Sequence, residues 1–344
     1  MTNPENHAEA AELTRDEIAS LHEPVLIDEV LDLLAPAFTG VEIATMIDAT
    51  LGMGGHTEAV ITAFPNVRVI GIDRDPNAIR LASKRLESFG ERFKAVHATY
   101  DSVYEVAEEN GLAGKIDAVL MDLGVSSLQL DDDERGFAYS RNTYLDMRMD
   151  PTQGITAAEL LATASAAELT RILRTFGEEK FASRIARNIE KQRETKPIET
   201  SLELTEIVRA SIPAAARRQG GNPAKRTFQA LRVAVNEELD ILADAVPAAL
   251  ESLKVGGRLV VESYQSLEDR IVKNVIKDGS EINIPPGLPV IPDHLKPSLE
   301  NVTRKAIQAT EEQIADNPRA ASVRLRAATI IRPYEAPTRI RRKR

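Results

Sequence analysis

The stretch Met46–Thr57 constrains the fold of this chain most strongly, because an apolar strand pattern runs directly into a turn with three glycines. Glycine has no side chain, so the backbone at Gly52, Gly54 and Gly55 allows a ligand to approach closely. We therefore expect a nucleotide-like cofactor at this turn, although Thr57 stands where a strict dinucleotide-binding fingerprint has its third glycine.

A second strand pattern supports this interpretation. Residues Val67–Asp73 are apolar and rich in β-branched side chains, and they end in an acid 19 residues after Gly54 (73 − 54). In dinucleotide-binding folds, a carboxylate at this place takes the hydroxyl groups of a ribose. We predict this role for Asp73; the alternative is that it only caps the following helix.

Strand and helix patterns continue to alternate beyond Asp73. Pro76 favours a helix start, and the helical pattern extends to about Phe89. Lys94–His97 and Ile116–Asp122 then read as two further strands, the second ending in an acid. This alternation predicts an α/β fold with an open parallel sheet, whose ligand lies at the switch point of the strand order.

Composition excludes several classes of protein. The chain has 344 residues, enough for one large or two medium domains, and no cysteine. The lack of cysteine excludes disulfides, thiolate metal sites and a cysteine nucleophile. No apolar run reaches the length of a membrane span, and Met1–Leu21 is polar and acidic, unlike a signal peptide. We expect a soluble, cytoplasmic protein.

The net charge of −10 is distributed unevenly. Residues 1–30 carry eight acids against Arg15, whereas Arg319–Arg344 carries nine bases against Glu335. These ends are typical of disordered acidic and basic tails.

An acid-free basic stretch, Arg209–Arg232, holds six bases. Clustered Lys and Arg side chains are a common footprint of phosphate binding. We expect Arg217, Arg218 and Lys225 to hold phosphates of a polyanion. The alternative is a solvated helix face without a partner.

Between about Gly124 and Gln219 the strand pattern gives way to helical spacing. Capping residues are expected at Thr156, Ser165 and Ser201. The predicted helices are Ala157–Leu161, Ala166–Phe176, Glu178–Glu194 and Ser201–Ala210. Their many charges are typical either of a surface that docks on a polyanion or of exposed helices.

The sheet pattern returns after this helical segment. The expected elements are a long helix over Thr227–Leu253, a strand over Arg258–Glu262, a helix over Leu267–Ile276, a loop over Ile284–Pro297, and closing antiparallel strands over Ala306–Thr310 and Ser322–Ile331. We therefore expect a disordered tail over residues 1–21, a sheet domain over 22–124 and 221–332, an inserted helical substrate-recognition domain over 125–220, and a basic tail over 333–344.

Several longer motifs occur together in a fixed order. They are His22–Leu26, Asp48–Thr57, Asp122–Ser127, Gln129–Asp133, Glu134–Phe137, Leu145–Asp150, Arg226–Leu231, Ser266–Val272 and Asn317–Arg319. With these motifs the chain resembles the bacterial 16S rRNA (cytosine-N4)-methyltransferase family, ribosomal RNA small subunit methyltransferase H, from His22 to about Ala327.

The resemblance implies a Rossmann-like class I methyltransferase sheet with an inserted all-helical domain. It implies S-adenosylmethionine as the methyl donor. It implies 16S rRNA or the assembled small subunit as the partner, with the methyl group transferred to a cytidine of the decoding region. A homodimer is one assembly to consider. The cofactor-binding residues implied are Gly54, Gly55, His56, Asp73, Tyr100, Asp122 and Gln129. Asp122 is also the candidate catalytic residue, and the phosphate contacts of Arg217, Arg218 and Lys225 become RNA contacts.

Some residues have a plainer interpretation or depart from the family pattern. The acids Asp131–Asp133 resemble metal ligands, but methyl transfer needs no metal and we expect a solvated loop there. Tyr100 stands where the family usually has phenylalanine, and either ring packs against an adenine face. Asn222 and Gln265 replace histidines, so neither position titrates near neutrality.

The chemistry of cytosine narrows the reaction. Methylation at carbon 5 usually needs a cysteine nucleophile, which this chain lacks. Methylation at the exocyclic nitrogen needs positioning and an acceptor for its N–H groups, a role suited to Asp122. The alternatives are a noncatalytic ribosome-assembly factor with a cofactor fold and, from another class, a nicotinamide-dependent dehydrogenase.

Overall fold

The chain divides into two compact units, described here in a computed structural model. One comprises Met1–Gly124 with Asp240–Arg344 and the other Val125–Leu239; we call them the sheet unit and the helical unit. The structure describes residues 14–20, 24–124, 135–139, 141–217, 222–282 and 296–336. Among these residues no helix is both long and apolar enough to cross a membrane.

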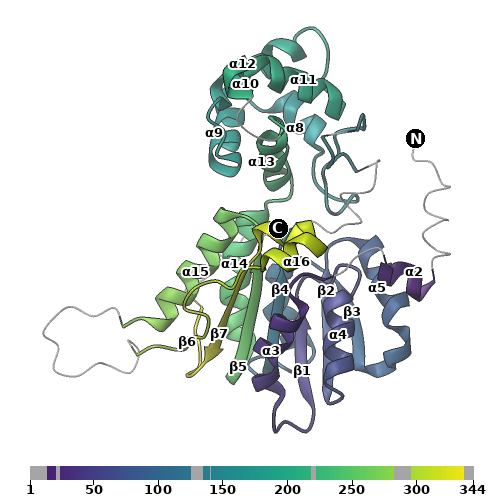
Figure 1. The fold of residues 1–344 in the computed structure, drawn as a ribbon, viewed down its shortest axis with the longest axis vertical. Coiled ribbons are helices and arrows are strands. Elements are labelled where there is room, and N and C mark those ends of the chain that lie inside the picture. The colour runs from purple at the N-terminus through teal and green to yellow at the C-terminus, as the bar shows by residue number, and fades with distance from the viewer. Residues whose placement is uncertain are drawn as a thin grey trace, which may run out of the picture. The chain divides into compact units, whose positions relative to one another are not determined.

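The sheet unit is built on a seven-stranded sheet with the order β3-β2-β1-β4-β5-β7-β6 (Figure 1). The strands are β1 Ala44–Asp48, β2 Val67–Asp73, β3 Phe93–His97, β4 Ile116–Asp122, β5 Leu253–Ser263, β6 Leu299–Asn301 and β7 Arg324–Ile330. The first five run parallel, and β7 pairs antiparallel with both β5 and β6. The order reverses between β1 and β4, so the expected open α/β sheet with a switch point is confirmed.

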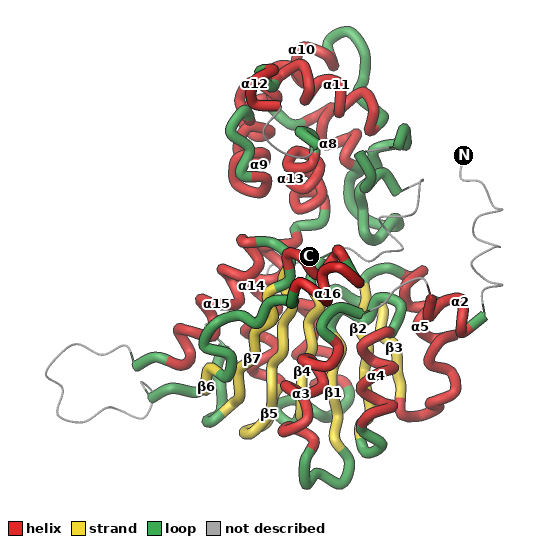
Figure 2. The backbone as a smooth tube through the Cα atoms, viewed as in Figure 1, coloured by secondary structure: helices red, strands yellow, loops and turns green. Residues whose placement is uncertain are grey.

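Helices cover both faces of this sheet, as the tube drawing also shows (Figure 2). The α-helices are α2 Arg15–Ser20, α3 Ile27–Phe38, α4 Gly55–Ala63, α5 Pro76–Leu86, α6 Val103–Glu109, α14 Glu238–Ser252, α15 Ser266–Ser280 and α16 Glu311–Asp316. Short 3-10 helices follow at Glu87–Arg92, Tyr100–Ser102 and Pro318–Ser322. This is the arrangement expected when the central strands of a parallel sheet are buried on both faces.

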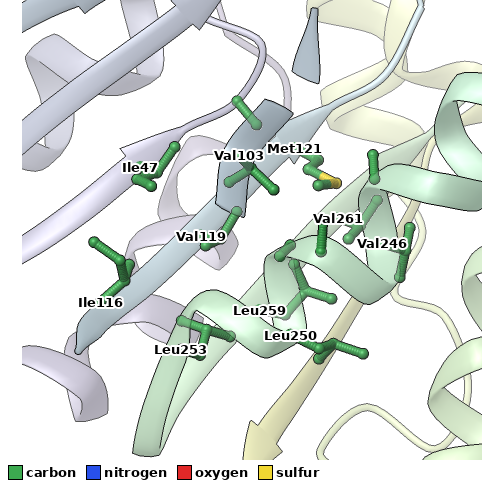
Figure 3. Packing of buried hydrophobic residues seen from close by; sticks show 14 of the residues in the cluster. Ile47, Val103, Ile116, Val119, Met121, Val246, Leu250, Leu253, Leu259 and Val261 are labelled. Carbon is green, nitrogen blue, oxygen red and sulfur yellow. The ribbon is translucent and has the colours of Figure 1, made fainter. Parts of the chain in front are cut away.

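Two apolar clusters sandwich the sheet because alternate strand residues point to opposite faces. On one face, Ile47 and Val119 pack with Val103 of α6 and Leu250 of α14 (Figure 3). On the other, Met46, Ala118 and Leu120 pack with residues of α3 and α4. Burial of each large aliphatic side chain contributes about 1.5–3 kcal/mol. These clusters hold the ends of β1, β4 and β5 in register.

The helical unit has its own apolar core. Its helices are α8 Ala157–Thr163, α9 Ala166–Gly177, α10 Ala182–Arg193, α11 Ser201–Ser211, α12 Ala214–Arg217 and α13 Lys225–Val235. Met147 and Met149 are both buried in this core, so they are apolar fillers. Gly177 of α9 permits close packing against α13, since a Cβ there would lie 2.5 Å from the carbonyl oxygen of Arg226.

The expected long helix over Thr227–Leu253 was wrong, because the chain forms α13 and α14 with a break between them. At the break Glu237 has a φ of 50°. The side chain of Asn236 donates to the carbonyl of Met147 and accepts from the amide of Met149, both at 2.7 Å. These tertiary hydrogen bonds stabilise a break that the apolar spacing alone does not reveal. As a result α13 lies in the helical unit rather than in the sheet domain to which its sequence was assigned.

Two further expectations need correction. Arg15–Ser20 forms α2 instead of a disordered tail, because Ile18 is fully buried and Arg15 pairs with Glu58 at 2.6 Å. Thr200 rather than Ser201 caps α11, since its side chain accepts from the amide of Glu203. The caps at Thr156 and Ser165 are confirmed.

The predicted pair of closing strands was half right. Arg324–Ile330 is β7, but its partner is β6 instead of residues 306–310. That segment makes only an isolated bridge from Ile307 to Leu325 among the described residues. The tails at 1–13 and 337–344, most of the loop at 284–297, and the acids Asp131–Asp133 lie outside the described residues.

Candidate active site

Acidic side chains lie at or next to the carboxyl ends of four neighbouring parallel strands, at one edge of the sheet. Asp48 ends β1, Asp73 ends β2 and Asp122 ends β4, and Glu262 lies opposite Asp122 in the register of β5. In open α/β sheets this edge, at the switch point, is the usual ligand site. The fold therefore gathers four carboxyl groups where a cofactor is expected.

The glycine turn connects β1 to α4 at this edge. Gly52 and Gly54 have φ values of 52° and 77°, which favour glycine. A Cβ on Gly54 would also lie 2.9 Å from Cδ1 of Leu86, and one on Gly55 2.6 Å from Cγ of Pro24. The glycines are thus required by backbone conformation and by packing within the protein, in addition to any approach of a ligand.

Asp73 does not cap the next helix. The cap of α5 is Asp75, whose side chain accepts from the amide of Asn77 at 3.0 Å. Asp73 instead accepts from the backbone amides of Gly52 and Asp75, each at 2.8 Å. Burial raises the pKa of Asp73 to about 6, although these hydrogen bonds oppose the shift. The carboxyl group is therefore tied to the glycine turn, while the residue as a whole is half-buried.

Asp48 has a structural environment at the end of β1. It is buried, and its carboxylate accepts from the hydroxyl of Thr57 at 2.7 Å and from the amide of Thr50 at 3.2 Å. Burial raises the pKa of Asp48, opposed first by the hydrogen bond from Thr57. Thr57 therefore links the strand to α4, which explains a threonine where a dinucleotide fingerprint has glycine.

His56, in the first turn of α4, lies between two carboxylates. Its Nδ1 is 3.6 Å from Oδ2 of Asp122, and its Nε2 is 3.2 Å from Oε2 of Glu262. Nε2 also lies 3.2 Å from the carbonyl oxygen of Val25. Side-chain exposure is 7% for His56, 0% for Glu262 and 20% for Asp122. Of these three, Asp122 is the one that reaches solvent substantially.

The charges of this cluster depend on one another. Burial alone lowers the pKa of His56, but the charges of Glu262, Asp122 and Asp48 outweigh it and raise that pKa to about 10. Burial raises the pKa of Glu262, and the charge of Asp122 adds to this, while His56 opposes the rise. The acidic neighbours therefore favour the protonated form of His56, against the effect of burial.

Tyr264 holds the other oxygen of Asp122. Its hydroxyl donates to Oδ1 of Asp122 at 2.9 Å. Burial and the charge of Asp122 raise the pKa of Tyr264, so the phenol keeps its proton. The backbone amide of Asp122 donates to the hydroxyl of Thr50 at 2.6 Å. The Asp122 carboxylate is thus oriented by neighbours on both oxygens.

The two positions that lack the family histidines have local hydrogen-bonding roles. Asn222 accepts from the amide of Ala224 at 2.9 Å and forms the turn before α13. Gln265 precedes α15, and its backbone amide donates to Glu268 at 3.0 Å. Neither contact requires a titrating side chain.

Six of the predicted site residues lie at the sheet edge just described. They are Gly54, Gly55, His56, Asp73, Asp122 and Tyr100, which begins the 3-10 helix after β3. Gln129 and Arg218 lie outside the described residues, while Arg217 ends α12 and the exposed Lys225 begins α13 in the helical unit. Glu262 and Tyr264 were not predicted. An acid near the carboxyl end of a predicted parallel strand was the available signal for Glu262.

Comparison with known proteins shows the family of this chain. The family model described as the MraW methylase family matches residues 19–331. A protein of Beutenbergia cavernae named ribosomal RNA small subunit methyltransferase H is 57% identical over 321 residues, 93% of this chain and 95% of that protein. One of the same name from Frankia alni is 56% identical over 309 residues, 90% and 94% of the two chains. The chain therefore belongs to the MraW methylase family.

Proposed function

We propose that this protein transfers the methyl group of S-adenosylmethionine to the exocyclic N4 amino group of a cytidine in 16S rRNA, in the decoding region. The observation that carries the proposal is the Asp122 carboxylate, oriented by Tyr264 and His56 and partly exposed at the switch point. Family membership and relatives named as small-subunit rRNA methyltransferases support it.

The residues at the sheet edge fit the cofactor. Asp73 offers carboxylate oxygens suited to a ribose diol, the ring of Tyr100 suits an adenine face, and the turn at Gly54, Gly55 and His56 suits the amino-acid portion. When bound, the cofactor supplies an electrophilic methyl group on a sulfonium. Asp122 is assigned to both cofactor binding and the reaction, and Gln129 to the cofactor by family resemblance.

Asp122 acts on the amino group that receives the methyl. The lone pair of N4 is delocalised into the cytosine ring, so the amino group is a poor nucleophile unless it is oriented. A carboxylate that accepts from an N4–H favours the geometry in which the lone pair attacks, and it accepts the proton that nitrogen loses. Positioning of this kind supplies most of the rate. The reaction needs no protein nucleophile, in agreement with a chain without cysteine.

The substrate nucleotide must be accessible. A cytosine in a duplex cannot present its amino group to a buried methyl donor, so the base is unstacked or comes from an irregular RNA region. The basic stretch with Arg217, Arg218 and Lys225 is assigned to the RNA phosphates. We place the protein in the cytoplasm with the ribosomal subunits.

The decisive experiment is a comparison of nucleosides from small-subunit rRNA with and without this gene, by mass spectrometry. Loss of N4-methylated cytidine in the deletion strain, restored by the wild-type gene, is the expected result. If rRNA methylation is unchanged while subunit assembly is impaired, the protein is a noncatalytic assembly factor. Restoration by the wild type but not by Asp122→Asn ties methylation to the site.

Asp73→Ala is expected to weaken S-adenosylmethionine binding by about 1.5–3 kcal/mol, the scale of hydrogen bonds to a charged group. Because the pKa of Asp73 is raised to about 6, wild-type affinity should be constant above that pH and fall as pH drops through 6 and the carboxylate is protonated. Calorimetry between about pH 5 and pH 8, a range that spans this pKa, measures both effects.

Asp75→Asn is the matched control for Asp73, because asparagine caps a helix as well as aspartate does. It should retain cofactor affinity at neutral pH, and the fall in affinity should move to slightly lower pH, because the charge of Asp75 contributes to the raised pKa of Asp73. Unchanged affinity in a folded Asp73→Ala protein contradicts the ribose assignment.

Replacing Arg217, Arg218 and Lys225 together by alanine is expected to weaken RNA binding and leave cofactor affinity intact. Each lost phosphate contact should flatten the log–log salt dependence of RNA affinity by about 0.7–0.9. Fluorescence anisotropy with a labelled rRNA fragment or subunit at several salt concentrations measures the slope.

A control triple variant removes three exposed cations of the sheet unit, Arg270, Lys273 and Lys305. It changes the net charge equally and should leave the salt slope almost unchanged. Equal slopes in the basic-stretch variant and the wild type assign RNA binding to other residues.

A further inference from the structure

Both ring nitrogens of His56 face hydrogen-bond acceptors. Nδ1 faces the carboxylate of Asp122 at 3.6 Å, and Nε2 faces the Val25 carbonyl and the Glu262 carboxylate, each at 3.2 Å. A neutral imidazole has one donor nitrogen and one acceptor nitrogen, whereas the imidazolium has two donors. The surroundings of His56 therefore match the imidazolium.

We propose that Glu262 is a positioning residue that keeps His56 doubly protonated, and that the resulting cation fixes the Asp122 carboxylate for its role in methyl transfer. The part that concerns Asp122 rests on the proposed function. The pairing of Glu262 with His56 stands on the geometry of the site alone.

Apart from His56, few groups stabilise the negative charge of the Glu262 carboxylate. It is fully buried, and neither carboxylate oxygen makes a well-directed hydrogen bond among the described residues. A buried carboxylate without compensation is costly, so the cation 3.2 Å away is its main stabilisation. The charge of Glu29 on α3 and that of Asp122 oppose ionisation of Glu262.

The other charged groups around His56 do not replace Glu262. Asp48 on β1 already accepts from Thr57 and from a backbone amide. On α4 itself, Glu58 pairs with Arg85 of α5 at 2.7 Å and with Arg15. Tyr264 donates to Asp122. Glu262 is thus the carboxylate nearest to a His56 nitrogen among these groups.

The same three side chains have the composition of a cation site, since their ligand atoms lie within 4.8 Å of one another. The two carboxylates, however, face opposite nitrogens of the ring. A metal ion binds one imidazole nitrogen, and its other ligands gather around the ion on that side. The geometry therefore favours an imidazolium bridge between two carboxylates.

In this bridge Asp122 can still accept a hydrogen bond from the substrate. Tyr264 holds Oδ1 and the imidazolium faces Oδ2, but a carboxylate offers about four lone-pair sites. Asp122 therefore keeps acceptor capacity for an amino group, and it is the member of the bridge with substantial exposure. Loss of the cation would leave Asp122 held from one side only.

The protonation of His56 is directly measurable by the 15N chemical shifts of its imidazole. The chain has five histidines, and His56→Gln identifies the resonance. In the wild type we expect both nitrogens to remain protonated through neutral pH and beyond. In Glu262→Gln, which keeps the shape but removes the charge, the pH of half-deprotonation should fall by about 1–3 units.

Two matched variants sharpen this test. Glu262→Asp keeps the charge and should keep His56 doubly protonated. Glu58→Gln removes one carboxylate from the same helix, two positions from His56, and should leave its titration unchanged.

Enzyme kinetics supply the second readout. In Glu262→Gln, kcat should fall about tenfold per pH unit above the lowered pKa of His56. Over the same range the wild type and Glu262→Asp should stay flat, and KM for the cofactor should change little. A uniform loss of rate without a changed pH profile indicates only a structural role and overturns the positioning assignment.

Other outcomes separate this inference from the proposed function. A neutral His56 in the wild type at pH 7, or identical titration in Glu262→Gln, overturns it, and neither measurement requires RNA. A stoichiometric divalent cation that is lost in His56→Gln also overturns it. If His56 behaves as expected but no cytidine is methylated, the ion pair stands and the proposed function fails.

Discussion

Asp122→Asn is expected to slow methyl transfer by about 100- to 1,000-fold at saturating cofactor and RNA, the loss seen when one preorganised polar group is removed from a reaction centre. Asparagine preserves the shape but presents a neutral oxygen or an NH2 group in place of the carboxylate. Neither accepts the N4 proton, and the ion pair with His56 is lost. Single-turnover methylation of the rRNA substrate measures the effect.

Two further variants show whether this loss reflects chemistry. Tyr264→Phe removes the hydroxyl that donates to Asp122 at 2.9 Å, so it should give a smaller loss. Asp117→Asn makes the same substitution near the amino end of β4, where Asp117 accepts from the amide of Thr45 at 2.7 Å. It should leave the single-turnover rate unchanged. A parental rate in Asp122→Asn limits Asp122 to cofactor affinity.

Asp269→Ala is expected to lower the free energy of unfolding by about 3–5 kcal/mol. Asp269 on α15 accepts from Arg326 of β7 at 2.6 and 3.3 Å, and Arg324 adds a charge at 3.6 Å. Both partners of the main pair are less than 10% exposed. Removing the acid leaves the Arg326 guanidinium buried without its counter-charge. Urea denaturation of the sheet unit within the full chain measures the change.

Asp278→Ala is the matched control, because it makes the same substitution at an exposed position of the same helix. It should change the unfolding free energy by less than about 0.5 kcal/mol. A double replacement, Asp269→Leu with Arg326→Met, should recover most of the stability, since no unpaired charge remains. Equal unfolding curves for Asp269→Ala and Asp278→Ala would show that the pair contributes little.

The local patterns of the sheet unit were strong enough to predict most of it. β2 and β4 begin and end at the predicted residues. Buried parallel strands have continuous apolar runs, and their flanking turns contain glycine, proline or acids, so both signals are local. The same local logic placed Asp73 and Asp122 at strand ends, where the sheet edge collects them.

Elements that depend on partners far along the chain were not predictable in this way. The apolar spacing of Thr227–Leu253 continues across the break at Glu237, where the side chain of Asn236 donates to the carbonyl of Met147 and accepts from the amide of Met149. Likewise the partner of β7 is β6, a three-residue strand too short to have a periodic signal. Tertiary contacts decided both cases.

The sequence by itself determined the glycine turn, the strand–helix order, the acids at the strand ends and the family, because these depend on short-range spacing and on motifs. Only the tertiary structure decided that Glu262 and Tyr264 join His56 and Asp122. The parallel pairing of β4 with β5 brings together segments far apart in the chain. The raised pKa of His56 follows from the carboxylates around it, against the effect of burial. The strand pairing and the pKa of His56 both depend on the folded environment, so they cannot be predicted from the type of a single side chain.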